Sequence, residues 1–110
     1  MKKTTLVNFD APCVARNEHF EVLSSEYLPT QVINKITVFP LKRLEGNIDS
    51  KLGKDSVLIF LSGTGSMEVN GQSVPVTSGD VVEVGAKEQF SIVNANLNEP
   101  LQFVSLFPKK

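Results

Sequence analysis

The sequence has few of the residues on which metal, redox and disulfide chemistry depend. Its 110 residues include one histidine, one cysteine, one tyrosine and no tryptophan. A single cysteine, Cys13, cannot form a disulfide within the chain. Nothing near Cys13 in the sequence would activate its thiol. We therefore expect Cys13 to be a small residue in the core or in a loop.

Charge of one sign and long apolar runs are lacking as well. Eleven basic residues face twelve acidic ones, and no basic block stands out, so the chain lacks the charge pattern of a nucleic-acid-binding protein. No apolar run approaches the ~18 residues of a membrane helix. The lysines near the start are followed by a run that Asn8, Asp10 and Pro12 interrupt, unlike a signal peptide. We expect a soluble cytoplasmic protein that binds neither nucleic acid nor membrane.

The sequence does contain many short apolar runs, each ended by turn residues. About eight of them are typical of strands in a sandwich or barrel. Asn70-Gly71 predicts a hairpin turn, because both residues can adopt positive φ. The runs are HFEVLSS, KITVFPL, SVLIFLSG, GSMEVNG, QSVPVTSG, DVVEVG, FSIVN and LQFVSLFP.

Helix is weakly indicated. Four apolar residues between positions 41 and 52 have a helix-like spacing. Gly46 and Gly53 oppose a helix there. We expect a turn or an irregular strand with a loop, and at most one short helix in the chain.

The order of the turns within 36–108 points to a family. The segment FLSGTGSMEVNG has a strand, a Gly-X-Gly turn and a short alternating strand, and the turn Ser78-Gly79-Asp80 precedes a buried strand. This block resembles a cupin. The resemblance implies an all-β, jelly-roll barrel of two antiparallel sheets. Residues 1–110 would form a single domain, in which 1–35 supply N-terminal strands and 36–108 form the barrel core.

The family's motifs are only partly present. Gly79 and Asn94 match the glycine and asparagine of the second cupin motif, but Phe90 stands where that motif has a metal-binding histidine. Gly85 and Lys87 replace its proline and glycine. The resemblance therefore implies a cupin without that histidine.

The first cupin motif lacks its ligands too. Its glutamate position falls on Ser56, and residues 46–58 contain neither histidine nor glutamate. A transition-metal site needs three or four converging ligands, and the chain's one histidine, His19, lies outside both motifs. We expect no metal and no cofactor, which disfavours a metal-dependent dioxygenase.

Strand alternation predicts what fills the barrel instead. If Phe90 points inward, the side chains two and four positions later do so too, and the same rule applies to the other strands. The lining would be a small apolar pocket for an organic ligand or a barrel filled by its own side chains. The predicted ligand-binding residues are Ser56, Leu58, Phe60, Met67, Phe90, Ile92 and Asn94, with Val69 on the same face. For Asn94 a structural role in a turn is favoured.

The opposite face of the strand SVLIFLSG is also apolar. Val57, Ile59 and Leu61 would point outward, so something is expected to cover them. Either residues 9–23 of this chain or a second copy of the protein could do so. Because cupins often pair, the resemblance favours a homodimer.

Three residues are weak candidates for proton transfer in a metal-free enzyme. His19 is the obvious titrating group, Tyr27 could supply a phenol, and Glu83 would matter if its side chain pointed inward. A surface position is the plainer interpretation of each. The segment SGTGS is a turn and not a phosphate loop, because no Lys-Ser/Thr follows it.

Three functions are therefore open. The first is a metal-free small-molecule-binding or auxiliary protein. The second is a metal-independent isomerase, epimerase or lyase acting on a sugar or a small carbonyl compound. The third is a structural, dimeric interaction module. The ligand is not identifiable from the sequence.

Overall fold

The computed structural model describes residues 1–6, 9–45, 55–85 and 88–109, and within these it contains strands and no helix. The predicted all-β class is confirmed. Most of the segment with helix-like spacing lies outside the described residues. The strands are β1 (Cys13–Arg16), β2 (Phe20–Ser25), β3 (Gln31–Val38), β4 (Arg43–Glu45), β5 (Ser56–Ser62), β6 (Thr64–Val69), β7 (Gln72–Thr77), β8 (Val81–Val84), β9 (Phe90–Val93) and β10 (Leu101–Pro108).

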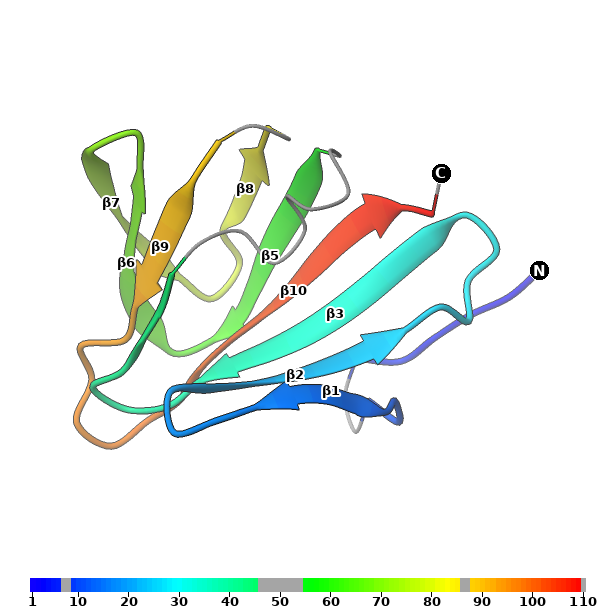
Figure 1. The fold of residues 1–110 in the computed structure, drawn as a ribbon, viewed down its shortest axis with the longest axis horizontal. Helices are drawn as coiled ribbons and strands as arrows, with labels where there is room; N and C mark the ends of the chain where they lie inside the picture. Colours follow the sequence, from blue (N-terminus) through cyan, green and yellow to red (C-terminus); the bar gives the residue numbers. More distant parts are fainter. Residues whose placement is uncertain (7–8, 46–54, 86–87, 110) are drawn as a thin grey trace.

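The strands form two antiparallel sheets, as expected for a jelly roll. The larger sheet has the order β1-β2-β3-β10-β5-β8, and the smaller one has the order β4-β9-β6-β7. In Figure 1 the smaller sheet lies at the left, and the larger sheet runs from β8 to β1 at the lower right. Strands distant in sequence are neighbours, since β10 pairs with both β3 and β5.

Two short strands, β1 and β4, were not among the eight apolar runs. Every residue of β1 is exposed, and β4 has only three residues. Each is an edge strand that pairs with a single neighbour, β2 or β9. Both strands form by backbone hydrogen bonding to a neighbouring strand. Their sequences therefore show little of the alternation of apolar and polar residues from which strands are predicted.

Tight turns occur where the sequence predicts them. Asn70 and Gly71 have φ of 52° and 80° in the hairpin between β6 and β7, which confirms the predicted turn. Gly63 lies between β5 and β6 with φ of 87°. A Cβ at Gly63 would lie 2.5 Å from the carbonyl oxygen of Pro100, so the chain can pass from one sheet to the other here only with glycine.

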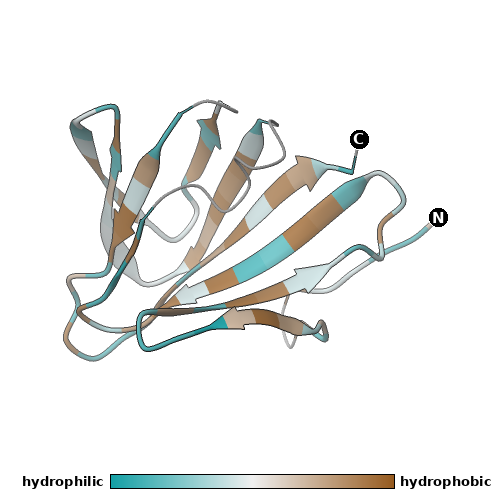
Figure 2. Ribbon diagram, viewed as in Figure 1, coloured by the Kyte–Doolittle hydropathy of each residue, from teal (hydrophilic) through white to brown (hydrophobic). Residues whose placement is uncertain are grey.

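The main core lies between the two sheets. Along β5, buried Ser56, Leu58 and Phe60 alternate with residues on the outer face, as a strand with one buried side requires. The rings of Phe60 and Phe103 lie 5.1 Å apart. Figure 2 shows the hydrophobic bands of β3 separated by a hydrophilic one. The buried apolar residues of this core are Val22, Ile36, Val38, Leu44, Leu58, Phe60, Met67, Val76, Val84, Phe90, Ile92, Leu101 and Phe103.

A second, smaller cluster covers the outer face of the larger sheet. Phe9 of the N-terminal segment is buried there against Ile33 and Val104. The Lys35 ammonium donates a hydrogen bond to the backbone oxygen of Leu6 over 3.0 Å. The N-terminal segment, one of the two elements expected to cover this face, therefore packs against it.

The described part of the chain contains no helix with the length and hydrophobicity needed to cross a membrane.

Candidate functional site

The side chains predicted to line the barrel do point into it. The seven predicted ligand-binding residues, from Ser56 to Asn94, have exposures between 0% and 7%. Val69 is partly buried and packs against the same core. The alternation rule was sufficient to place them, because burial on one face imposes a period of two on each strand.

The barrel centre is packed and not hollow. A side chain that lines a cavity wide enough for a water molecule keeps some accessible surface facing that cavity. Leu58, Phe60, Met67 and Ile92 are at most 1% exposed, so no water-sized space adjoins them. Small barrels are commonly filled by their own side chains in this way. Around these four residues the interior is therefore filled by side chains.

Asn94 is held by hydrogen bonds to the backbone. Its amide nitrogen donates to the carbonyl oxygens of Val38, at 3.0 Å, and of Glu99, at 2.8 Å. Its amide oxygen accepts from the backbone nitrogen of Asn96 at 2.9 Å. These bonds join the end of β9 to β3 and to the loop before β10. The side chain thus has the structural role favoured by the sequence.

Phe90 stands at the position that the resemblance to the second cupin motif assigns to a metal-binding histidine. It begins β9, pairs with Val69 on β6 and is 7% exposed. A phenyl ring offers no nitrogen, oxygen or sulfur to a metal. Within the residues that the structure describes, no group of three histidine, cysteine, aspartate or glutamate side chains could hold a metal ion.

The three proton-transfer candidates are not brought together. His19 and Tyr27 lie beyond opposite ends of β2, whose six residues span about 20 Å. The His19 side chain is 43% exposed, with Nε2 3.4 Å from a carboxylate oxygen of Glu18, and Tyr27 is 54% exposed. Glu83 is exposed on β8 and pairs with Val57, so it points to the outer face. No two of these groups could act on one substrate in the barrel.

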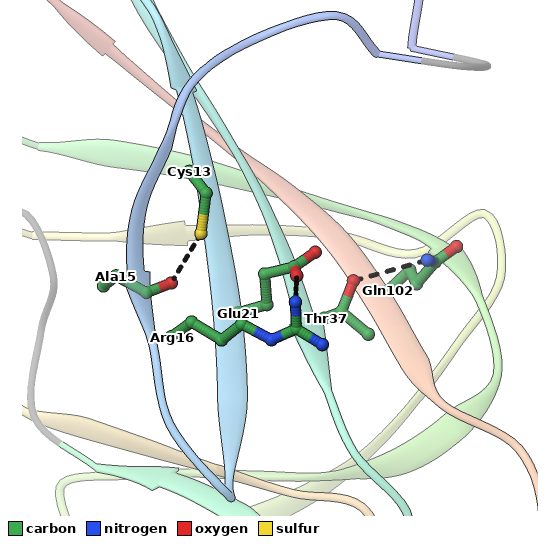
Figure 3. Close-up of polar contacts among 6 residues, drawn as sticks. All are labelled: Cys13, Ala15, Arg16, Glu21, Thr37 and Gln102. Atoms are coloured by element: carbon green, nitrogen blue, oxygen red, sulfur yellow. Dashed lines mark hydrogen bonds and ion pairs between the residues drawn. The ribbon is translucent and has the colours of Figure 1, made fainter.

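Polar contacts on the larger sheet are ordinary cross-strand pairs. Figure 3 shows Arg16 bridging to Glu21 at 3.4 Å and Gln102 donating to the Thr37 hydroxyl at 3.3 Å. Cys13 lies exposed in β1, so the expectation that it is buried or sits in a loop is wrong, and its thiol donates to the backbone oxygen of Ala15 in the same strand. The contacts of Arg16 with Glu21 and of Gln102 with Thr37 tie neighbouring strands together.

A depression on the smaller sheet is a concave feature that sequence reasoning missed. Ser91 of β9 pairs with Glu45 of β4 on one side and with Glu68 of β6 on the other. Their strand neighbours Leu44, Met67 and Ile92 are buried, so these three side chains project from the outer face. We call this feature the outer depression. It has a volume of about 440 Å³ and is lined by Glu45, Glu68, Asn70, Gly71, Gln89, Phe90 and Ser91.

Hydrogen bonds fix two walls of the outer depression. Arg43 lies beside it, with Nε 3.2 Å from a Glu45 carboxylate oxygen and Nη2 donating to the Ser91 hydroxyl at 3.3 Å. Asn70 donates from its amide nitrogen to Glu88 at 3.0 Å. Of the residues predicted to bind a ligand, Phe90 is the one in this lining. The alternation of GSMEVNG marks Glu68 as outward, but no local signal places it beside Ser91.

No protein-family model matches the sequence, and no curated protein matches it. Solved structures do match. A Cupin 2 conserved barrel domain protein from Salinispora arenicola has a TM-score of 0.72 at 16% identity, covering 97% of this chain and 87% of that one. A Klebsiella pneumoniae protein with a double-stranded β-helix domain has a TM-score of 0.72 at 15% identity, covering 87% and 82%. The chain has the cupin fold.

The cupin fold alone does not choose a function. The polyketide cyclase RemF from Streptomyces resistomycificus matches with a TM-score of 0.75 at 13% identity, over 100% of this chain and 80% of its own. At such identities the likeness concerns the path of the backbone, whereas activity depends on particular side chains. The site therefore has to be argued from the residues of this chain.

Proposed function

We propose that this cupin-fold chain is a metal-free, non-catalytic auxiliary module that works by pairing with a second copy of itself. The observation that carries the proposal is an apolar patch on the outer face of the larger sheet, beside the N-terminal segment. We call it the β5–β8 patch. It consists of Val57, Ile59, Leu61, Val81 and Leu106.

The packed interior supports a role outside the barrel. Catalysis or binding inside would need space and at least two converging polar groups. Phe60, Met67 and Ile92 fill that space, and the titratable candidates point to solvent or to the outer face. The interior then serves as a core, and the function falls to the outer surfaces.

The β5–β8 patch is continuous across three strands. Val81 pairs with Ile59, which pairs in turn with Val104, and Val57 pairs with Leu106. Val81 is 63% exposed, while Ile59, Leu61 and Leu106 are only partly buried by the cluster around Phe9. A contiguous apolar surface of this kind on a small domain is typical of an interaction site.

We propose that the β5–β8 patch binds a second copy of the chain. Within β5, β8 and β10 the outward side chains next to it carry one charge, Glu83, at the edge of the sheet. Two such faces related by a twofold axis can bury their apolar centres while keeping Glu83 at the rim. The resemblance to cupins favours the same pairing.

The cytoplasm is the expected compartment, where an exposed Cys13 stays a free thiol.

Sedimentation of the purified chain at micromolar concentration tests the proposal. We expect the mass of two chains. Val81→Lys places a charge in the β5–β8 patch and should weaken pairing by at least about tenfold, giving the mass of one chain. Val14→Lys is the matched control, because Val14 is 61% exposed at the other edge of the same sheet. A wild-type mass of one chain, or equal effects of the two variants, would contradict the proposal.

A further inference from the structure

The turn between β6 and β7 is the only place in the sequence where glycine follows asparagine, at Asn70-Gly71. Both residues are exposed, with φ of 52° and 80°. Val69 and Gln72 close the ladder, so the backbone nitrogen of Gly71 lies outside it. Apart from its chain neighbours, no described residue has a heavy atom within 4 Å of the position that a Cβ of Gly71 would occupy. The Gly71 nitrogen is therefore accessible to reaction.

The Asn70 side chain attaches this turn to the corner between β8 and β9, and both lie at the top of Figure 1. Its amide nitrogen donates to one carboxylate oxygen of Glu88 at 3.0 Å. The other carboxylate oxygen accepts from the backbone nitrogen of Gly85 at 2.8 Å. The backbone nitrogen of Glu88 donates to the Gly85 carbonyl oxygen at 3.0 Å. Glu88 is thus held in the corner through both its backbone and its side chain.

We propose that Asn70 is a modification site, at which spontaneous deamidation releases the β6–β7 hairpin from the β8–β9 corner. The Gly71 nitrogen bonds to the side-chain carbonyl carbon of Asn70. The bond from that carbon to the amide nitrogen breaks, and ammonia leaves with the proton of the Gly71 nitrogen. Water then opens the five-membered imide to aspartate or isoaspartate. One water is consumed and one ammonia is released, and no oxidant or reductant takes part.

Glycine makes this position more reactive than the other exposed asparagines. The attacking nitrogen must closely approach the side-chain carbon of the preceding residue, and a side chain on its own residue would obstruct that approach. Asn17 and Asn98 are exposed as well, but each of them precedes a glutamate. We therefore expect deamidation at Asn70 well before it occurs at either of these residues.

The product cannot hold the hairpin as asparagine does. A carboxylate has no N–H to donate, so the hydrogen bond to Glu88 is lost. The new negative charge replaces a donor that lay 3.0 Å from a carboxylate which Gly85 keeps in place. Like charges side by side repel each other. The end of the hairpin should move away from the corner, a one-way change that accumulates as the molecule ages.

The first experiment is mass spectrometry of the full chain after storage in mildly alkaline buffer. Trypsin releases 55–87, in which Asn70 is the only asparagine, and 88–109, which contains Asn94, Asn96 and Asn98. We expect the first peptide to gain one mass unit with time, located at Asn70 by fragmentation. The gain should be larger in water enriched in heavy oxygen, because water opens the imide. The second peptide is the internal control and should stay unchanged.

Two variants test whether Glu88 restrains the reaction. The amide nitrogen that leaves is the donor to Glu88, so that hydrogen bond has to break first. Glu88→Ala should therefore speed deamidation by about fivefold, which corresponds to one exposed hydrogen bond to a charged group. Phe9→Ala is the control. It weakens the fold on the outer face of the larger sheet, away from the hairpin, and should leave the rate unchanged.

A further pair of variants tests the release of the hairpin. Asn70→Asp carries the product, so amide hydrogen exchange at Val69 and Gln72 should be about fivefold faster than in the wild type. Adding Glu88→Gln supplies a side-chain N–H opposite the new carboxylate and removes the repulsion. Exchange in this double variant should return to the wild-type rate.

The proposal is overturned if 55–87 gains no mass, or if 88–109 gains it equally fast. It is also overturned if Glu88→Ala reacts no faster than the wild type, or if Phe9→Ala reacts as fast as Glu88→Ala. Wild-type exchange in Asn70→Asp, or a failure of Glu88→Gln to restore it, would overturn the release. None of these outcomes depends on the sedimentation mass, so failure here leaves the pairing proposal standing.

Discussion

The two faces of β5 differ in how completely their side chains are buried. The inward residues Ser56, Leu58 and Phe60 are at most 4% exposed and belong to the core between the sheets. The outward residues Ile59 and Leu61 are only partly buried, under a cluster that rests on the N-terminal segment. The inner side is held by strands from both sheets, and the outer side by one short segment. The inner side therefore carries most of the packing, and the outer side is the face on which we propose that a second copy pairs.

The largest expected effect is on the inner side. Phe60→Ala removes a ring that is 1% exposed and whose centroid lies 5.1 Å from that of the tilted Phe103 ring. The packed surroundings cannot collapse into the cavity, so the free energy of unfolding should fall by about 3–5 kcal/mol in urea titrations. Ile59→Ala, on the other face of the same strand, should cost about 1 kcal/mol, since part of its surface is already in water. Similar losses for both would refute the difference between the faces.

The next largest loss of stability is expected from removing the hydrogen bonds of the Asn94 side chain at the end of β9. Asn94→Ala removes all three side-chain hydrogen bonds and leaves the buried carbonyl oxygen of Val38 without its side-chain donor. We expect a loss of about 2–3 kcal/mol in the free energy of unfolding. The control is Asn98→Ala, an exposed residue of the same loop, which should behave as the wild type. A neutral Asn94→Ala would mean that the amide is not structural.

Of the three main substitutions, Phe60→Ala, Asn94→Ala and Phe9→Ala, the last, in the N-terminal segment, should have the smallest effect. Phe9→Ala should lower the free energy of unfolding by about 2 kcal/mol, because the segment can move into solvent and no closed cavity remains. Trypsin should then cleave faster at Lys2 and Lys3, while the core resists. Leu97→Ala, at a loop residue 71% exposed, is the control. A loss as large as that of Phe60→Ala would show that the outer cluster belongs to the main core.

Much of the fold was accessible to sequence reasoning because its signals are local. Alternation located the long strands, Asn70-Gly71 marked a hairpin, and a phenylalanine at position 90 already indicated an interior unlike that of a metal-binding cupin. The exposed strand β1 and the three-residue β4 were missed, since edge strands need no hydrophobic face of their own.

The candidate sites were much less accessible. Glu45, Glu68 and Ser91 are separated in sequence and meet only because β4, β9 and β6 are neighbours in one sheet. The sequence left open whether the barrel holds a ligand pocket or is filled by its own side chains, and Leu58 and Met67 lie packed within it at no more than 1% exposure.

By itself the sequence determined which side chains face inward, because a strand with one buried side must alternate with a period of two. Only the tertiary structure decided which strands lie side by side, that the barrel is filled, and that the N-terminal segment rests on the larger sheet. Those features depend on contacts between residues far apart in the chain, and no local pattern encodes them.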